Sequence, residues 1–233
     1  MKIANIICSF NSPSLTERVY KQMKGQVGDL YVLENSTDDA KLFRCPEMID
    51  MGRVNRGFGG MHDFIFSDKR FRKYDFVGIF NNDVYDIPPN YVRALSKYMA
   101  HDIGVLASAL CDTGTGWNHM RRKAWEGLRD VPHVEDAAAW FNVRLFDKLC
   151  AFIPYEFFGI LDITISMLYR KAGYRTVVSD DFALGHMLAG AREMAGVKEK
   201  YLTEFSGSMS QWLKQHPELK ANYDEYFKNI CQE

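Results

Sequence analysis

The chain has 233 residues, of which 47% are hydrophobic and 25% are charged, and its formal net charge is -1. These values are typical of one large globular domain and argue against a disordered chain. The near-zero charge, without any long basic block, gives no support for unspecific binding to nucleic acid or to an anionic membrane surface.

Short apolar runs alternate with helical patterns along the first half of the chain. This alternation predicts an α/β fold with a mostly parallel central sheet flanked by helices. Ligands bind such sheets beyond the carboxyl ends of the strands. The expected strands are 3–8, 30–33, 76–80 and 103–109, and the expected helices are 13–24, 59–67 and 88–99.

The second half is less regular. Residues 111–130 are expected to form a long irregular segment, followed by a strand at 137–143, a helix at 161–172 that ends at Gly173, and a short strand at 176–178. A hinge is predicted at 206–208. We therefore divide the chain into a domain at 1–205 and a C-terminal helical extension at 206–233, which packs on that domain or forms a homodimer.

Two features of the sequence bear on its location. No apolar run approaches the roughly 20 residues that span a bilayer, and the apolar start is too short for a secretory signal. The 5 cysteines are scattered and lack any CxxC spacing, which favours reduced thiols over a disulfide framework or a zinc site. We expect a cytoplasmic protein without a transmembrane segment.

The cluster Asn81-Asn82-Asp83 ends the apolar strand at 76–80. A divalent cation on a diphosphate needs only one or two protein carboxylates, because phosphate oxygens and water supply its other ligands. Asp83 is therefore a candidate metal ligand, and Asn81 or Asn82 is a candidate contact to a ribose or sugar hydroxyl. The alternative is an ordinary turn after a strand.

The segment 55–63, Asn-Arg-Gly-Phe-Gly-Gly-Met-His-Asp, opens an expected helix. Backbone N–H groups near Gly57, together with the guanidinium of Arg56, are suited to a phosphate. The dinucleotide fingerprint is excluded, since it would directly follow the first strand. The alternative is a helix-entry turn whose glycines serve only backbone freedom.

Two later residues are candidates for chemistry. Asp162, at the start of the helix at 161–172, is placed to act as a general base or simply to cap the helix. His186 is a candidate metal ligand through one ring nitrogen, the alternative being a packed histidine. The glycine-rich stretch 114–119 is a candidate acceptor platform or lid, because Trp117 can stack on a sugar and Asn118 lies beside it.

Several motifs in this order resemble the inverting glycosyltransferases of family 2, which have the GT-A fold, and especially their rhamnosyltransferase-like branch. The similarity covers roughly residues 1–190. The motifs that carry it are Ser9-Phe10-Asn11, the stretch 32–38 (Val-Leu-Glu-Asn-Ser-Thr-Asp), the stretch 55–60 (Asn-Arg-Gly-Phe-Gly-Gly), Asn81-Asn82-Asp83, residues 157–174 and the late His186.

This resemblance implies a nucleotide-sugar donor, most simply a UDP-sugar, and a Mn²⁺ or Mg²⁺ ion held by Asp83 and His186. It also implies that Asp162 is the catalytic base. The residues that it assigns to the donor are Ser9, Asn11, Glu34, Asn35, Arg56, Gly57, Asn81 and Asn82, with Glu34 accepting from the N3–H of uracil or thymine. The sequence departs from the family pattern at Leu161, Thr164 and Leu168, where the family has Glu, Asp and Arg.

The expected activity is metal-dependent transfer, with inversion, of a hexose or deoxyhexose from a nucleoside diphosphate to a hydroxyl of a glycan. Two alternatives stay open. One is a sugar nucleotidyltransferase, although the residues after the first strand lack the glycine-rich, arginine-bearing loop which that class needs. The other is a non-catalytic protein that binds sugar nucleotides and derives from a transferase, as the missing carboxylates around Asp162 would allow.

Overall fold

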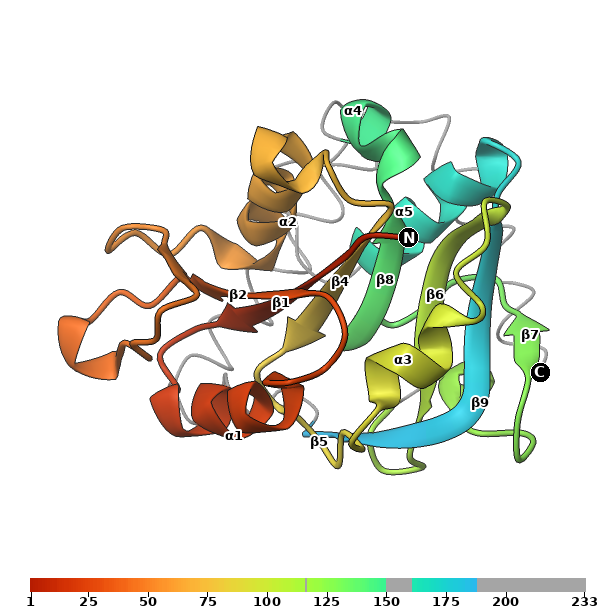
Figure 1. Cartoon of the computed structure of the whole chain (residues 1–233), viewed down its shortest axis with the longest axis horizontal. Coiled ribbons are helices and arrows are strands. Elements are labelled where there is room, and N and C mark those ends of the chain that lie inside the picture. Colours follow the sequence, from red (N-terminus) through yellow and green to blue (C-terminus); the bar gives the residue numbers. More distant parts are fainter. Residues whose placement is uncertain (116, 150–160, 188–233) are drawn as a thin grey trace.

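A computed structural model describes residues 1–115, 117–149 and 161–187 of the chain (Figure 1). The predicted hinge and C-terminal helices at 206–233 lie outside the described residues, as do Cys150, Cys231 and most of the motif that precedes Asp162. The division into two units and the homodimer therefore stay predictions. No helix of the described part is both long and apolar enough to cross a bilayer.

Nine strands of the described part form one curled sheet, in the order β3-β2-β1-β4-β8-β6-β9-β5, with β7 paired to β9 off this path. They are β1 (Ile3–Ser9), β2 (Asp29–Glu34), β3 (Met48–Asp50), β4 (Phe76–Asn81), β5 (Val84–Tyr85), β6 (Ile103–Leu110), β7 (Leu128–Asp130), β8 (Ala138–Asn142) and β9 (Arg175–His186). Because β1 and β8 are buried along their whole length, they read as continuous apolar runs rather than as alternating patterns.

The directions of these strands decide which residues meet. β1 is parallel to β2 and β4, whereas β8 runs antiparallel to both β4 and β6, and β9 is parallel to β6. It follows that β1, β2, β4, β6 and β9 all end at one edge of the sheet, and that β8 begins at that same edge. The expected α/β fold is confirmed, with the antiparallel β8 set into its centre.

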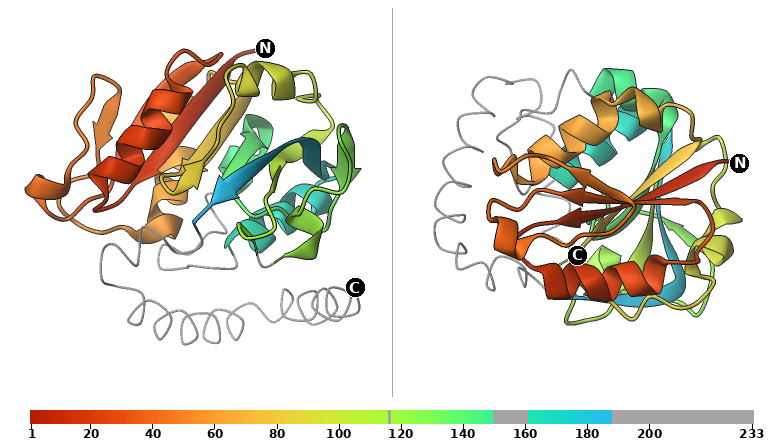
Figure 2. Two further views of the ribbon diagram at one scale, coloured as in Figure 1. Left: turned by 90° about the horizontal axis from the view of Figure 1, so that it is seen from below. Right: turned by 60° about the vertical axis from the view of Figure 1, so that its left-hand side comes forward.

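Helices cover both faces of the sheet (Figures 1 and 2). On one face lie α1 (Pro13–Met23) and α3 (Tyr91–Ser96), and on the other lie α2 (Gly57–Ser67), α4 (Phe146–Leu149) and α5 (Leu161–Lys171). Helix α3 is shorter than predicted because Asn90 has a positive φ of 63°, which is incompatible with a helix passing through it. Helix α5 ends as predicted, at a glycine with a φ of +87°.

The core lies on both sides of β4 and β8. Its largest fully buried side chains include Trp140, Tyr91 and Phe80, and the indole N–H of Trp140 donates to Asn5 Oδ1 at 3.2 Å. This bond satisfies the polar atom of a side chain that contributes mainly apolar contact. Three of the cysteines, Cys8, Cys45 and Cys111, are free thiols, as predicted for them.

Strand β9 is longer than the predicted strand at 176–178. Its first half pairs with β6, and its end pairs with β5, so that Val84 lies opposite His186. Ser108 pairs with Ser179 and the next residue, Ala109, pairs with Ala183, so residues 180–182 are additional on the β9 side. This bulge bends the strand, as Figure 1 shows, and brings its last residue back to the segment that follows β4.

Candidate active site

Polar residues gather at the edge where the parallel strands end. This edge receives the ends of β1, β2, β4 and β9 and, because β8 is antiparallel, the residues that precede β8. Helix α5 is tied to the same place, since Ser166 Oγ accepts from Val134 N at 3.2 Å. Residues that are distant in the sequence are thus brought to one site.

Asp83 and His186 form the first pair at this edge. The Nε2 atom of His186 lies 3.3 Å from Asp83 Oδ1, and each side chain is only 7% exposed. Val84 and Tyr85 pair with the end of β9, which fixes this approach. Gly185 is required there, because a Cβ atom at this position would lie 2.0 Å from the ring of Tyr85.

Glu135 lies on the other side of the imidazole. His186 Nδ1 lies 3.2 Å from Glu135 Oε1 and 3.1 Å from the carbonyl oxygen of Gly114, while Glu135 Oε2 accepts from Thr115 Oγ1 at 2.6 Å. Burial alone would lower the pKa of His186, but the hydrogen bonds and charges of Asp83 and Glu135 outweigh it and raise that pKa to about 10. Without a metal the ring is therefore protonated between two carboxylates, and a metal ion at Nε2 would displace the proton there.

The residues present fit a divalent cation. A carboxylate oxygen and an imidazole nitrogen converge from β9 and from the turn after β4, and both atom types ligate Mn²⁺. Among the described residues no group of three His, Cys, Asp or Glu side chains is arranged to hold a metal. Two protein ligands suffice for an ion whose other ligands are diphosphate oxygens and water.

Asp162 lies in the first turn of α5, is half-buried, and accepts from the backbone N of Ile163 at 2.9 Å through Oδ1. Burial and the negative charges of Asp136 and Glu135 raise the pKa of Asp162 well above its usual range. Glu135, whose charge is one cause of this shift, also contacts His186, the neighbour of Asp83.

Glu34 belongs to an internal hydrogen-bond network. Its carboxylate is fully buried and accepts from Ser9 Oγ at 2.8 Å, from the backbone N atoms of Ser36 and Phe43 at 3.0 Å each, and from Ser36 Oγ. A carboxylate has about four acceptor positions, and these four donors occupy them. Ser9, also fully buried, serves the same network, and the contact of Glu34 with a nucleobase stays a prediction.

Asn35 holds the entry of α2 to the end of β2. Its Oδ1 accepts from Arg56 N at 3.0 Å, and its Nδ2 donates to Asn55 Oδ1 at 3.1 Å, an oxygen that also accepts from Gly57 N at 2.8 Å. Gly57 has a φ of +64°, which a side chain would strain. Asn35 and Gly57 therefore position the backbone, whereas Arg56 Nε is buried without a hydrogen-bond acceptor in the described part of the chain.

The two asparagines after β4 have different surroundings. Asn82 is 4% exposed and its Nδ2 donates to Thr16 Oγ1 at 3.2 Å, while its contact with a ribose or sugar stays a prediction. Asn81 is half-buried at the edge. Asn11, after β1, exchanges hydrogen bonds with Thr37, through Nδ2 at 3.3 Å and Oδ1 at 3.1 Å.

The predicted acceptor platform is partly packed into the protein. The Trp117 ring is half-buried and meets the ring of His133 edge to face, with centroids 4.6 Å apart. Asn118 is exposed and accepts from Lys123 Nζ at 2.7 Å. The backbone N of Trp117 donates to Thr115 Oγ1 at 3.0 Å, so this segment connects to Glu135 and hence to His186.

Sequence reasoning missed Glu135, Asp136 and His62. Asp136 Oδ2 lies 2.9 Å from His62 Nε2, and both side chains are buried. Two adjacent acids directly before the apolar run 137–141 were a usable signal, but only with the direction of that strand known. In a fully parallel sheet they would lie at the opposite edge from the site.

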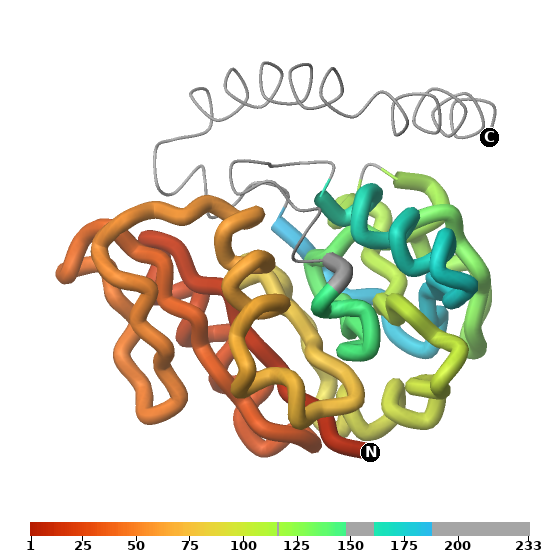
Figure 3. The backbone as a smooth tube through the Cα atoms, turned by 90° about the horizontal axis from the view of Figure 1, so that it is seen from above, coloured from red at the N-terminus to blue at the C-terminus, as the bar shows by residue number. Residues whose placement is uncertain are grey.

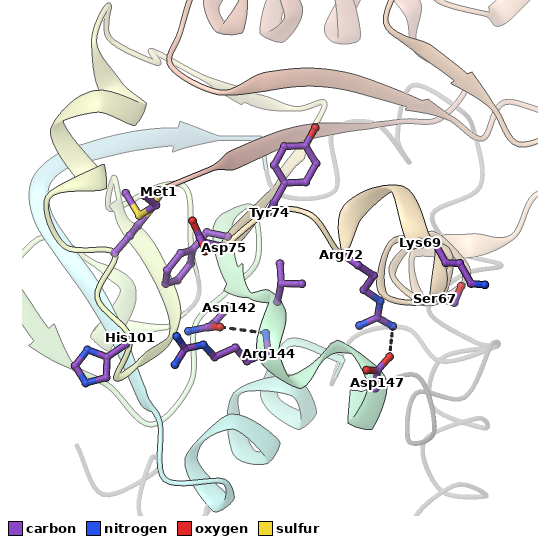
Figure 4. A pocket seen from close by; sticks show the side chains of 13 residues that line it. Met1, Ser67, Lys69, Arg72, Tyr74, Asp75, His101, Asn142, Arg144 and Asp147 are labelled. Atoms are coloured by element: carbon purple, nitrogen blue, oxygen red, sulfur yellow. Dashed lines mark hydrogen bonds and ion pairs between the residues drawn. The ribbon is translucent and has the colours of Figure 1, made fainter.

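A hollow of about 690 Å³ lies elsewhere, at the edge of the sheet where the parallel strands begin (Figure 4). It is lined by Met1, Tyr74, Phe76 and Asn142 among others, and by Arg72, which is paired with Asp147 at 2.7 Å. None of the candidate site residues lines it. The hollow is therefore separate from the candidate active site, which lies at the carboxyl ends of the strands.

The curled sheet, its strand order and the helices on both faces define the GT-A fold of glycosyltransferases. A mannosyltransferase from Pyrobaculum calidifontis, solved with GDP-Man and Mn²⁺, is similar in structure with a TM-score of 0.59 at 16% identity, over 90% of this chain and 64% of that one. TarS of S. aureus (residues 1–349) gives a TM-score of 0.58 at 15% identity, over 83% and 63% of the two chains.

GalNAc-T7, solved with UDP, GalNAc and Mn²⁺, gives a TM-score of 0.60 at 10% identity, over 79% of this chain and 43% of that one. The chain thus spans less than two thirds of the length of each of these three neighbours. No protein-family model matches the sequence, and no curated protein is similar to it in sequence. The neighbours confirm the GT-A fold.

Proposed function

We propose that the chain is a metal-dependent glycosyltransferase that transfers a hexose or deoxyhexose from a nucleoside diphosphate, most simply UDP, to a hydroxyl of a glycan, with inversion at the anomeric carbon. One observation carries this proposal. The candidate metal pair Asp83–His186 lies where the parallel strands end, and helix α5, which carries the candidate base Asp162, is tied by Ser166 to the segment whose Glu135 contacts His186. The GT-A fold, shared with transferases solved with nucleotides and Mn²⁺, supports it.

Asp83 and His186 would hold Mn²⁺ or Mg²⁺ against the donor diphosphate. A bound divalent ion stabilises the negative charge that a leaving nucleoside diphosphate gains. Glu135 positions His186, because its carboxylate accepts at Nδ1 and leaves Nε2 directed at Asp83. Carboxylates commonly orient ligating histidines in this way.

The donor side would be completed by Arg56, Asn11 and Asn81. Arg56 presents a cation at the entry of α2, where backbone N–H groups also favour phosphate. Asn11 follows β1 and Asn81 ends β4 at the same edge, where a nucleoside would bind beyond the carboxyl ends of the strands. With Glu34 occupied internally, the rim formed by Asn11 and Thr37 is the better candidate for the base contact.

Asp162 would act as the general base. As the acceptor oxygen attacks the anomeric carbon, the bond from that carbon to the diphosphate oxygen breaks, and the hydroxyl proton passes to the Asp162 carboxylate. A pKa raised well above the usual range makes this carboxylate a stronger base than an exposed aspartate. Attack on the face opposite the leaving group gives inversion.

The test is Asp162→Asn in the full chain, with donors screened first by thermal shift against UDP-, dTDP- and GDP-sugars with Mn²⁺. We expect transfer to fall by about 10²–10⁴-fold while the dissociation constant of the donor stays within about twofold. The matched control is Asp147→Asn, an exposed acid at the opposite edge. Near-normal transfer by Asp162→Asn would show that the base assignment is wrong.

One observation favours a second candidate function. Leu161 and Thr164 stand beside Asp162 where the related family has acids, and both are buried. The second candidate function is binding of sugar nucleotides without catalysis. In that case the wild-type chain would show saturable donor binding and no metal-dependent hydrolysis of the donor.

A further inference from the structure

Arg18 of helix α1 lies beside the candidate metal pair and has no role in the site described so far. Its Nη2 atom lies 3.4 Å from the carbonyl oxygen of Val84 and 3.6 Å from Sδ of Met187. Val84 directly follows Asp83 and pairs with His186, and Met187 directly follows His186. The guanidinium therefore contacts a neighbour of each candidate metal ligand.

The pairing of β5 with β9 places Arg18 on the side of Asp83. Met187 N donates to Asp83 O at 3.0 Å, which continues the antiparallel pairing by one residue. Residues that face each other in such a pair direct their side chains to the same side, and so does the residue two positions along the strand. Met187 and Tyr85 thus share the side of Asp83. Arg18 contacts both, because its guanidinium carbon lies 5.4 Å from the centre of the Tyr85 ring.

The guanidinium of Arg18 is a cation without a carboxylate partner in the described part of the chain. It is half-buried, and its buried Nε atom has no hydrogen-bond partner among the described residues. Three other arginines, whose side chains are 24–28% exposed, each pair with an aspartate: Arg53, Arg72 and Arg129. A half-buried cation that lacks an anion within the protein is suited to an anion from outside it.

The contacts that Arg18 does make are weak enough to be exchanged for better ones. At 3.4 Å its approach to Val84 O is long for a hydrogen bond, and a thioether sulfur is a weak acceptor. Phosphate oxygens accept charge-assisted hydrogen bonds from a guanidinium, often two at once. The Tyr85 ring holds the guanidinium near Asp83, since the ring itself packs directly on Gly185.

We propose that Arg18 binds the donor diphosphate beside the metal ion that Asp83 and His186 would hold. The proposal rests on the proposed function, because it needs a diphosphate at this pair. A guanidinium on the side of Asp83 can bind diphosphate oxygens that do not ligate the metal ion. It also favours the leaving nucleoside diphosphate over the intact donor, because the leaving group gains negative charge as its bond to the sugar breaks.

The experiment measures dissociation constants in the full chain by titration calorimetry with Mn²⁺ present. The probes are inorganic pyrophosphate, which is a diphosphate without base or sugar, and UDP, dTDP and GDP. In Arg18→Gln we expect the constants of pyrophosphate and of the nucleoside diphosphate that binds wild type to rise by the same factor. This factor should be about 10–100-fold, because charged hydrogen bonds to the diphosphate are lost.

Two further variants separate phosphate binding from a structural role. Arg18→Lys keeps a cation but not the planar fork, so it should recover part of the affinity that Arg18→Gln loses. The matched control is Lys21→Gln, which removes a cation from the same helix. Lys21 is exposed and pairs with Glu17, so this variant should bind every probe within about twofold of wild type. Melting temperatures are measured for all variants.

The outcomes separate this inference from the proposed function. If Arg18→Gln lowers the melting temperature but binds pyrophosphate as wild type does, Arg18 is only structural and the inference is wrong. If wild type binds neither pyrophosphate nor any nucleoside diphosphate, the inference and the proposed function are both wrong. If the constants rise as expected but wild type transfers no sugar, Arg18 is a diphosphate-binding residue and the proposed transfer is wrong.

Discussion

The two halves of the sheet use their polar residues in different ways. Figure 3 shows residues 1–81 beside the described residues of the later half, and the two parts meet where β4 pairs with β8. In the first half, buried polar groups such as Glu34 and Asn82 are satisfied by internal hydrogen bonds. In the later half, Asp162 and His186 have strongly raised pKa values. The polar groups of the first half thus mainly hold the fold, whereas the later half carries the candidate base and the candidate metal-binding histidine.

Asp83 lies at the boundary between the two halves. Its substitution tests whether transfer needs this carboxylate in addition to the candidate groups of the later half. Removing this ligand should weaken binding of the cation, and a bound cation stabilises the transition state by several kcal/mol. We therefore expect Asp83→Ala to lower the rate of transfer by about 10³-fold. Chelation of the metal should have the same effect on wild type. Measurements use saturating donor and added Mn²⁺.

Its control is Asp86→Asn, an exposed residue three positions later with a positive φ of 60°, a conformation that asparagine also accepts. This variant should keep its activity within about twofold. Full transfer by Asp83→Ala, or by wild type after exhaustive chelation, would remove the metal from the proposed function.

A substitution at Glu34 tests the stability of the first half. Glu34→Gln leaves at least one buried donor without its charged acceptor, so we expect the free energy of unfolding to fall by about 3 kcal/mol. Chemical denaturation measures it, with Glu17→Gln as control, because the Glu17–Lys21 pair is exposed and worth less than about 0.5 kcal/mol. A large loss of donor affinity at unchanged stability would instead support the predicted contact with the base.

Glu135 gives the smallest of these effects and concerns the later half alone. Glu135→Gln keeps an acceptor for Thr115 but no longer orients His186 with a carboxylate. Because carboxylates that orient ligating histidines contribute about 10–100-fold to metal affinity, we expect the Mn²⁺ dissociation constant to rise by that factor. Titration calorimetry with donor present measures it.

The exposed Glu126→Gln is the corresponding control and should bind Mn²⁺ as wild type does. If Glu135→Gln also binds Mn²⁺ normally, then His186 is not a ligand or does not need Glu135. If His186 is not a ligand, the proposed metal site is not at the end of β9.

The first half of the fold could be predicted closely because its elements are local. β1, β4 and α1 agree with their predicted ranges to within one residue at each end, since a buried parallel strand is an uninterrupted apolar run and α1 begins at a proline. The short β3 and β5 could not be predicted, because two or three residues carry no periodicity. They form only where a neighbouring strand offers its edge.

The site could be predicted only in part, for two physical reasons. Strand ends pointed to the region of Asp83 and the resemblance to family 2 pointed to Asp162 and His186, and the structure brings Asp83 and His186 together. Whether a polar side chain faces a ligand or a neighbour depends on tertiary packing, so the internal network of Glu34 could not be predicted. The acids before β8 were missed because the direction of a strand is decided by its partners.

The bulge in β9 has a consequence for how the chain tolerates change. Residues 180–182 hold the loop before β7, with Asp180 and Asp181 accepting from Arg129 Nε and Gly127 N. Pairing with the neighbouring strands resumes at Ala183, and these partners determine which way the imidazole of His186 faces. Because bulge residues lie outside the ladder, a residue added or removed between Ser179 and Ala183 would disturb the hold on that loop without turning the imidazole away from Asp83. The bulge thus lets the loop before β7 vary in evolution independently of the strand end.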